Sequence, residues 1–227
     1  MNRNLRRTIQ LAVVCVAVLA AAAPASAAVY TLNTCFNGTP PTSTSPWLTA
    51  EFKDVFGGVE LTLTSSLNVP SEFISEVAFN VNPNILPSAI TIVNTTIDDP
   101  LVVSVSHSTQ NAQKLQGGGS AGFEFDILVK WSEAAHNGGI QRFNGDDIEK
   151  FTFAFTGVSA ADFDFTNTGG ANAHLGAHIQ GIPDNTGGTT SGAIKDGSVP
   201  EPCTLAIWSL LGVCGMGIGW RRRKQTA

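Results

Sequence analysis

Apolar and polar residues alternate along most of the chain from Val29 to Ile182, which is the pattern of half-buried β-strands. The clearest run is Val59-Glu60-Leu61-Thr62-Leu63-Thr64. Comparable runs occur at 73–81, 90–97, 101–106, 123–131, 151–155, 163–165 and 178–182, separated by turns rich in Gly, Asn, Asp and Pro. Amphipathic helical periodicity does not extend beyond a turn or two. We therefore predict an all-β fold, an antiparallel β-sandwich of jelly-roll type, over residues 28–184.

Phenylalanines within this region are spaced two apart, so each group lies on one face of a strand. The groups are Phe123 and Phe125; Phe151, Phe153 and Phe155; and Phe163 and Phe165. This spacing favours a shared apolar core over a platform on which sugars stack, because the rings alternate with polar residues. Trp47, Trp131 and Tyr30 remain as aromatic side chains that we expect to be exposed and available to a ligand.

Both ends of the chain carry apolar segments with basic flanks. At the start, Arg3, Arg6 and Arg7 precede an apolar run over residues 11–23, and Ala25-Ser26-Ala27 provides an A-x-A cleavage site. These are the parts of a secretory signal peptide. We expect signal peptidase to remove residues 1–27, so that the mature protein begins at Ala28.

The second apolar segment runs from Cys203 to Trp220 without a charged side chain. As a helix, its 18 residues would extend about 27 Å, close to the roughly 30 Å of bilayer hydrocarbon. Arg221, Arg222, Arg223 and Lys224 follow directly and would stay in the cytoplasm. A single transmembrane helix is therefore predicted, with everything before it on the far side of the membrane.

The residues before this helix are Val199, Pro200, Glu201 and Pro202, and the two prolines keep this segment extended. Together with the apolar run and the arginine cluster, the motif resembles the PEP-CTERM sorting signal of exported bacterial proteins. The resemblance covers residues 199–224. It implies recognition of the motif by a membrane protease of the exosortase type, followed by release or transfer of the preceding domain. An anchor that is never processed is the alternative.

The segment 185–198 is rich in Gly, Thr and Ser, and we interpret it as a flexible linker before the sorting signal. Residues 28–198 contain six basic and seventeen acidic residues, a formal charge of −11. Such a surface does not favour nucleic acids. Cys35 is the single cysteine of this region, so it cannot form an internal disulfide, and we expect it to be buried.

Candidate chemistry is sparse. The sequence of residues 118–122, Gly-Gly-Ser-Ala-Gly, matches the G-x-S-x-G motif of a nucleophile elbow. However, this segment leads into a predicted strand, whereas a nucleophile elbow leads into a helix. His174 and His178 would stand about 13 Å apart on a strand, too far to share one ion unaided. Asp146 and Asp147, in the turn after Asn144, are weak candidates for a structural calcium site, although ordinary turn chemistry also explains them. We find no catalytic constellation and do not expect an enzyme.

These observations predict an exported protein that is held in the inner membrane by its tail and then sorted to the cell surface or extracellular matrix. Its expected role is structural or adhesive, in the envelope, exopolysaccharide or biofilm. The alternative is a secreted carbohydrate-binding module or carbohydrate-active enzyme on the same sandwich, which requires exposed aromatic side chains beside convergent carboxylates.

Overall fold

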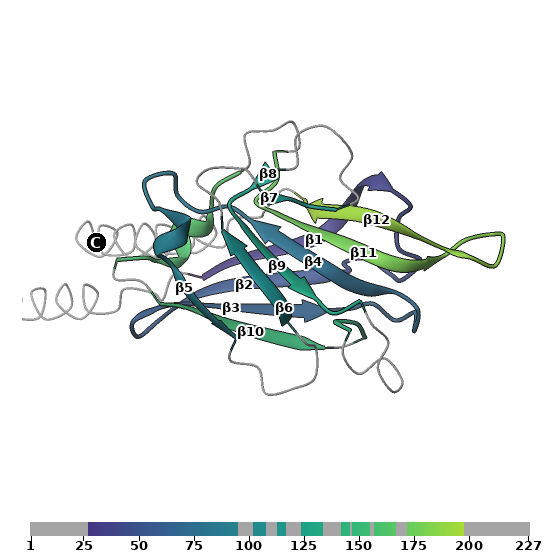
Figure 1. Cartoon of the computed structure of the whole chain (residues 1–227), viewed down its shortest axis with the longest axis horizontal. Helices are drawn as coiled ribbons and strands as arrows, with labels where there is room; N and C mark the ends of the chain where they lie inside the picture. The colour runs from purple at the N-terminus through teal and green to yellow at the C-terminus, as the bar shows by residue number, and fades with distance from the viewer. Residues whose placement is uncertain are drawn as a thin grey trace, which may run out of the picture. The chain divides into compact units, whose positions relative to one another are not determined.

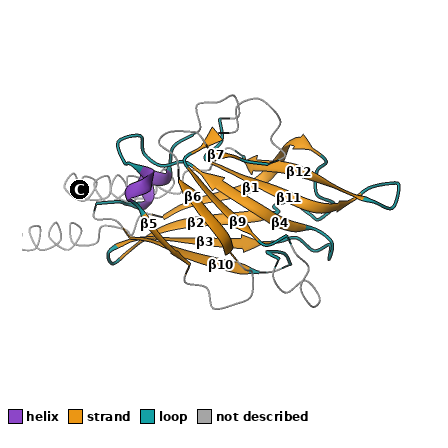
Figure 2. Ribbon diagram, viewed as in Figure 1, coloured by secondary structure: helices purple, strands orange, loops and turns teal. Residues whose placement is uncertain are grey.

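The computed structural model describes residues 27–94, 102–107, 113–116, 124–133, 142–145, 147–154, 157–166 and 172–197. Strands account for most of these residues, together with two short 3-10 helices (Figures 1 and 2). The strands are β1 (Ala27–Gly38), β2 (Leu48–Val55), β3 (Gly58–Ser65), β4 (Phe73–Phe79), β5 (Thr91–Asn94), β6 (Val102–His107), β7 (Gln113–Lys114), β8 (Glu124–Phe125), β9 (Ile127–Trp131), β10 (Ile148–Ala154), β11 (Leu175–Pro183) and β12 (Thr189–Asp196). The 3-10 helices are η1 (Pro87–Ala89) and η2 (Ala160–Phe163).

Ten of the strands form one antiparallel sheet in the order β5-β10-β3-β2-β1-β12-β11-β4-β9-β6, and β7 pairs with β8 beside it. The two edge strands, β5 and β6, are neighbours along the chain and are joined by only seven residues. The sheet must therefore curl until its edges approach each other, because seven residues span at most about 27 Å between strand ends. The all-β, antiparallel prediction is confirmed, with one continuous sheet instead of two separate ones.

Aromatic side chains fill the inside of the curled sheet. Phe52 on β2 lies with its ring centroid 5.6 Å from that of Phe79 on β4, although three strands separate β2 from β4 in the sheet order. Phe79 also packs against Phe153 on β10 at 5.6 Å, and all three side chains are fully buried. The two halves of the sheet thus pack face to face over a shared core, as the phenylalanine spacing predicted.

Strand β3 shows how the sequence pattern produces this arrangement. Its burial alternates along the strand, with Val59, Leu61 and Leu63 fully buried and the residues between them partly exposed. Every residue of β4 is buried, because its outer face is also covered. There Ala78 packs with Leu115, Phe125 and Leu128 in a second apolar cluster, to which β8 contributes Phe125. Because β4 is buried on both faces, its two polar residues need partners inside the protein: Ser75 contacts His178, and Glu76 is paired with Lys130.

The structure corrects the strand predicted at 163–165. Residues 160–163 form η2, whose first turn is fixed by Asp162: its carboxylate accepts hydrogen bonds from the Ser159 amide and hydroxyl, both at 2.9 Å. Phe163 still contributes to the core, stacking on Phe52 with ring centroids 4.5 Å apart. Phe165 lies two residues beyond the end of η2 and is partly exposed, so the two rings do not share one face of a strand.

The predicted linker at 185–198 is wrong. Residues 189–196 form β12, which lies between β1 and β11 in the middle of the sheet, with Ala193 and Ile194 fully buried. Gly192 is required there because an added Cβ would overlap the Thr39 carbonyl oxygen. The compact unit consequently continues to Gly197, and the expected domain boundary at residue 184 moves to the start of Ser198.

Candidate functional site

The residues predicted to direct sorting lie outside the described part of the chain. These are Val199, Pro200, Glu201 and Pro202, the apolar run 203–220, and Arg221 to Lys224. Among the described residues, no helix combines the length and the apolar character needed to cross a bilayer. The predicted sorting signal therefore remains an inference from sequence.

The predicted signal-peptide cleavage site falls at the start of β1. Ala25 lies outside the described residues, whereas Ala27 and Ala28 pair with Lys53 and Phe52 of β2. A chain beginning at Ala28 would lose one pair of this ladder and keep the rest. Cleavage between Ala27 and Ala28 is thus compatible with the sheet.

Four side chains from separate segments meet where β12 ends; we call them the strand-end cluster. They are Tyr30 of β1, Asp164 after η2, His174 before β11, and Asp196 at the end of β12. Asp196 accepts hydrogen bonds from the backbone amides of His174 and Leu175, at 2.8 and 2.9 Å, and its second oxygen lies 2.8 Å from His174 Nδ1. Asp164 accepts a hydrogen bond from the Tyr30 hydroxyl at 2.9 Å and lies 3.3 Å from His174 Nε2.

The two carboxylates in this cluster favour a protonated His174. The hydrogen bond with Asp196 raises the pKa of His174, and burial opposes this only in part. Burial, followed by the adjacent Asp164 carboxylate, raises the pKa of Tyr30 well above its usual range, so the phenol remains a hydrogen-bond donor. The Tyr30 and His174 rings also pack against each other, tilted by 32°, at a centroid distance of 5.0 Å.

The hydrogen-bonding capacity of His174 is used within the cluster. One ring nitrogen faces Asp196 and the other faces Asp164, so neither is directed at an open site. The Asp196 side chain is only 3% exposed, and both its oxygens already accept hydrogen bonds. This arrangement can fasten the end of β12 to β1 and β11; it offers no nucleophile and no vacant base.

His178 is separate from this cluster. It is buried on β11, where its Nδ1 lies 2.9 Å from the Ser75 hydroxyl of β4. Burial lowers the pKa of His178, which therefore favours the neutral ring. His174 and His178 have different partners, and the structure does not bring them together at one site, as their strand spacing indicated.

The aromatic side chains expected to be exposed are buried. Trp47 is 7% exposed, Trp131 is 2% exposed and Tyr30 is 1% exposed. Trp47 donates a hydrogen bond from its indole nitrogen to the Ser43 carbonyl oxygen at 2.7 Å, and Trp131 packs on Phe143 at 5.0 Å. The expectation of an aromatic ligand platform at these residues is wrong, because the curled sheet encloses them.

Of the two calcium candidates, Asp146 lies outside the described residues. Asp147 accepts a hydrogen bond from the Asn144 amide at 2.9 Å, while its own amide donates to the Asn144 carbonyl oxygen at 3.1 Å. These are the bonds of a polar turn. Within the described ranges, no group of three or more His, Cys, Asp or Glu side chains is placed to hold a metal ion.

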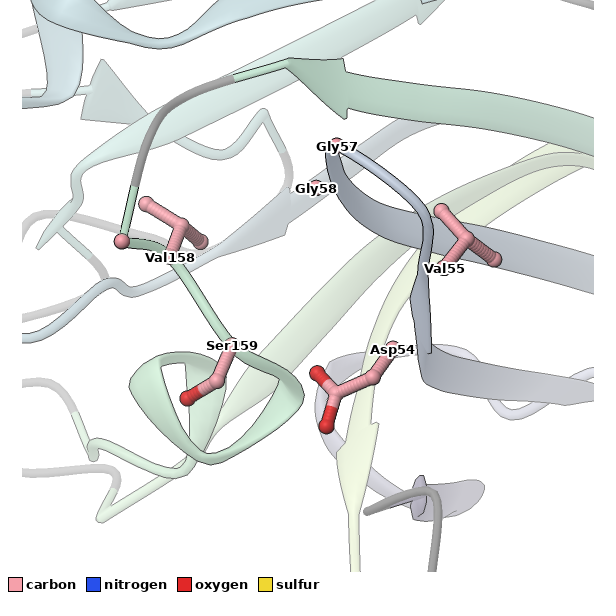
Figure 3. A pocket seen from close by; sticks show the side chains of 7 residues that line it. Asp54, Val55, Gly57, Gly58, Val158 and Ser159 are labelled. Atoms are coloured by element: carbon pink, nitrogen blue, oxygen red, sulfur yellow. The ribbon is translucent and has the colours of Figure 1, made fainter.

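A small open cavity lies beside the turn that joins β2 and β3 (Figure 3). Its volume is about 390 Å³, and it is lined by Asp54, Val55, Gly57, Gly58, Gly157, Val158 and Ser159. Asp54 points from β2 towards η2, where it accepts a hydrogen bond from the Ala160 amide at 2.7 Å (Figure 3). One oxygen of this carboxylate therefore stabilises the first turn of η2.

Phe56 stands at the apex of this turn and is fully exposed. The backbone can reverse there because Gly57 adopts a φ of +87°. We call Val55, Phe56, Gly57 and Gly58 the hairpin tip. A fully exposed phenylalanine contributes no buried apolar area, so Phe56 does not stabilise this fold through the core.

Comparisons with protein-family models, with curated proteins and with solved structures find no match for this chain. Fold and function must therefore be argued from its own residues.

The sequence prediction missed the strand-end cluster, since it placed Asp196 in a linker and considered His174 only as a possible metal ligand. One available signal was Ala193-Ile194, a pair of apolar residues inside the polar stretch, followed by Lys195 and Asp196. Cys35 also differs from expectation: it is partly exposed, with its thiol 3.5 Å from the Asn37 carbonyl oxygen.

Proposed function

We propose that this chain is an exported bacterial envelope protein whose β-domain is delivered by a signal peptide, held in the inner membrane by its tail, and sorted by an exosortase-type protease. The observation that carries the proposal is the order of three elements within residues 199–224: Val-Pro-Glu-Pro, an uncharged apolar run, and four consecutive cations. After sorting, the domain resides at the cell surface or in the extracellular matrix.

Two features of the described domain support this role. Its ten-stranded sheet encloses an aromatic core that needs no disulfide, so the domain can fold after export whatever the redox conditions. The acidic net charge of residues 28–198 favours solubility outside the cell. We propose that the curled sheet serves as a sandwich-type, jelly-roll-like module with a structural or adhesive role in the envelope, exopolysaccharide or biofilm.

The competing function is a carbohydrate-binding module or carbohydrate-active enzyme. It depended on exposed aromatic side chains, and Trp47 and Trp131 are both buried. No observation on the described residues therefore favours it over the structural role.

Replacing Pro200, Glu201 and Pro202 together by alanine tests the sorting step. We expect full-length protein to accumulate in the membrane fraction, because the extended recognition segment is lost, while the wild-type chain is shortened near Pro202. Intact mass and fractionation of protein from the native host provide the measurement.

The matched control replaces Asp184, Asn185 and Thr186, in the turn between β11 and β12, by alanine. This control should be processed like the wild type. Unchanged processing of the Pro-Glu-Pro variant, or a wild-type chain that still ends at Ala227, would overturn the proposal.

A further inference from the structure

We infer that the hairpin tip, with Phe56 at its apex, contacts the lipid surface of the membrane in which the tail is held. This inference rests on the proposed function, since it needs residues 203–220 to span the bilayer. It goes further by specifying which end of the domain faces the membrane and which side chain enters the lipid.

Strand direction defines the end from which the chain continues towards the sorting motif. Asp196 of β12 is paired with Leu32 of β1, and the Gly197 amide donates to the Thr31 carbonyl oxygen. Because β12 is antiparallel to β1, the chain leaves Gly197 heading towards the first residues of β1. Ala27, at that start, is paired with Lys53, three residues before Phe56. The chain therefore leaves the described domain in the direction of the hairpin tip.

The register measures how far the hairpin tip projects in that direction. Thr31, which marks the level of Gly197, is paired with Thr49 of β2. Phe56 lies seven residues further along β2 and its turn. At about 3.3 Å per residue, the tip projects about 23 Å beyond the level at which Gly197 leaves the sheet.

The chain between Gly197 and the apolar run is no longer than this projection. Five residues, Ser198 to Pro202, separate Gly197 from Cys203. Fully extended, this segment places Cys203 at most about 20 Å from Gly197. Since β12 uses most of the supposed linker, the five residues that remain before the apolar run span no more than the distance by which the tip projects.

The side chains at this end suit a neutral lipid surface. Phe56 is fully exposed and its neighbours Gly57 and Gly58 have no side chain that would hinder approach. Leu86, which is 53% exposed, belongs to the segment between β4 and β5, and this segment returns to the same end of the domain. Asn82 in this segment donates a hydrogen bond to Asp162 of η2. Thr91, at the start of β5, pairs with Ala154, which in turn pairs with Gly58 of the tip. Burial of a phenylalanine side chain in an apolar phase is worth roughly 1.5–3 kcal/mol.

The charges near the tip argue against attraction to anionic lipid. Asp54 is bound to the Ala160 amide, and Asp162 and Asp164 lie on and just after η2, while Lys53 is an exposed cation on β2. This mixed, mostly acidic neighbourhood does not favour a negative surface. Contact through Phe56 should consequently occur on zwitterionic lipid and change little with salt.

The test uses the mature chain, Ala28 to Ala227, reconstituted in phosphatidylcholine vesicles. Cys35, Cys203 and Cys214 are replaced by serine or alanine, and Phe56→Cys carries an environment-sensitive fluorophore. Ile148→Cys is the matched control, because Ile148 is also apolar, is 49% exposed, and pairs with Thr64 at the opposite end of the sheet. We expect spin-labelled lipid to quench the fluorophore at 56 at least threefold more than at 148, with little change in high salt.

Alkaline carbonate extraction of the same vesicles distinguishes a failure of the membrane anchor from a failure of the lipid contact at Phe56. A chain that is released by carbonate has no inserted tail, which overturns the proposed membrane anchoring and this inference together. A chain that stays inserted, with equal quenching at positions 56 and 148, overturns the lipid contact alone. Quenching at 56 that disappears in high salt would contradict the apolar mode of contact.

Discussion

Replacing Asp196 by alanine should destabilise the whole domain, because this carboxylate fastens the last strand to its neighbours. It accepts hydrogen bonds from the backbone amides of His174 and Leu175 and from the ring of His174, all at 2.8–2.9 Å. The residue is 5% exposed, so water cannot easily replace these bonds.

The expected loss follows from the donors left behind. A buried donor that loses its partner costs about 1–3 kcal/mol, and the substitution affects two amides and one ring nitrogen, of which the ring is partly exposed. We therefore expect the free energy of unfolding to fall by about 3–5 kcal/mol. For a domain whose total stability is of the order of 5–15 kcal/mol, this is a large fraction. Asp196→Asn keeps one acceptor for the amides and should lose about 1–2 kcal/mol.

Urea unfolding of the segment Ala28–Gly197 measures these differences. Trp47 and Trp131 are both buried in the folded state, so their fluorescence reports unfolding directly. The pH dependence is a second readout. Because the pKa of His174 is raised in the folded state, its contribution is complete below the unfolded value of about 6.5 and is lost as the pH rises through the folded value.

The difference in stability between wild type and Asp196→Ala should thus be larger at pH 6 than at pH 9. An Asp196→Ala protein that unfolds at the same urea concentration as the wild type would refute the role of the carboxylate. A stability difference that stays constant between pH 6 and pH 9 would contradict the charged pairing with His174, while leaving the backbone bonds in place.

Two further predictions concern the same fold. Deleting residues 185–197 should abolish cooperative unfolding in the tryptophan assay, because it opens the sheet between β1 and β11; a deletion that leaves the urea transition unchanged would restore the linker interpretation. Replacing Glu72 by alanine should lower the free energy of unfolding by about 3–5 kcal/mol, because its buried carboxylate accepts hydrogen bonds from the amide and hydroxyl groups of both Thr42 and Ser43. Glu72→Gln is the isosteric control in the same urea assay, and equal stability of wild type and Glu72→Ala would contradict that assignment.

Local patterns in the sequence were enough to identify the fold class and much of the core. Alternation in residues 59–64 predicted β3, because a strand with one buried face needs an apolar residue at every second position. The spacing of Phe151 and Phe153 likewise predicted two rings on one face of β10, and both are fully buried. These features depend on the near neighbours of each residue, which the sequence displays directly.

Only the tertiary structure decided the positions of β12, Asp196 and the tryptophans. In the sequence, Gly192 suggests a flexible segment. In the structure, a glycine is needed at this position because the backbone of Thr39, which is 153 residues away in the chain, lies against it. Trp47 and Trp131 are buried because the sheet curls over itself, and Asp196 meets His174 because β12 lies beside β11. Long-range pairing of this kind leaves no periodic pattern in the sequence, since each partner is determined by the packing of the complete sheet.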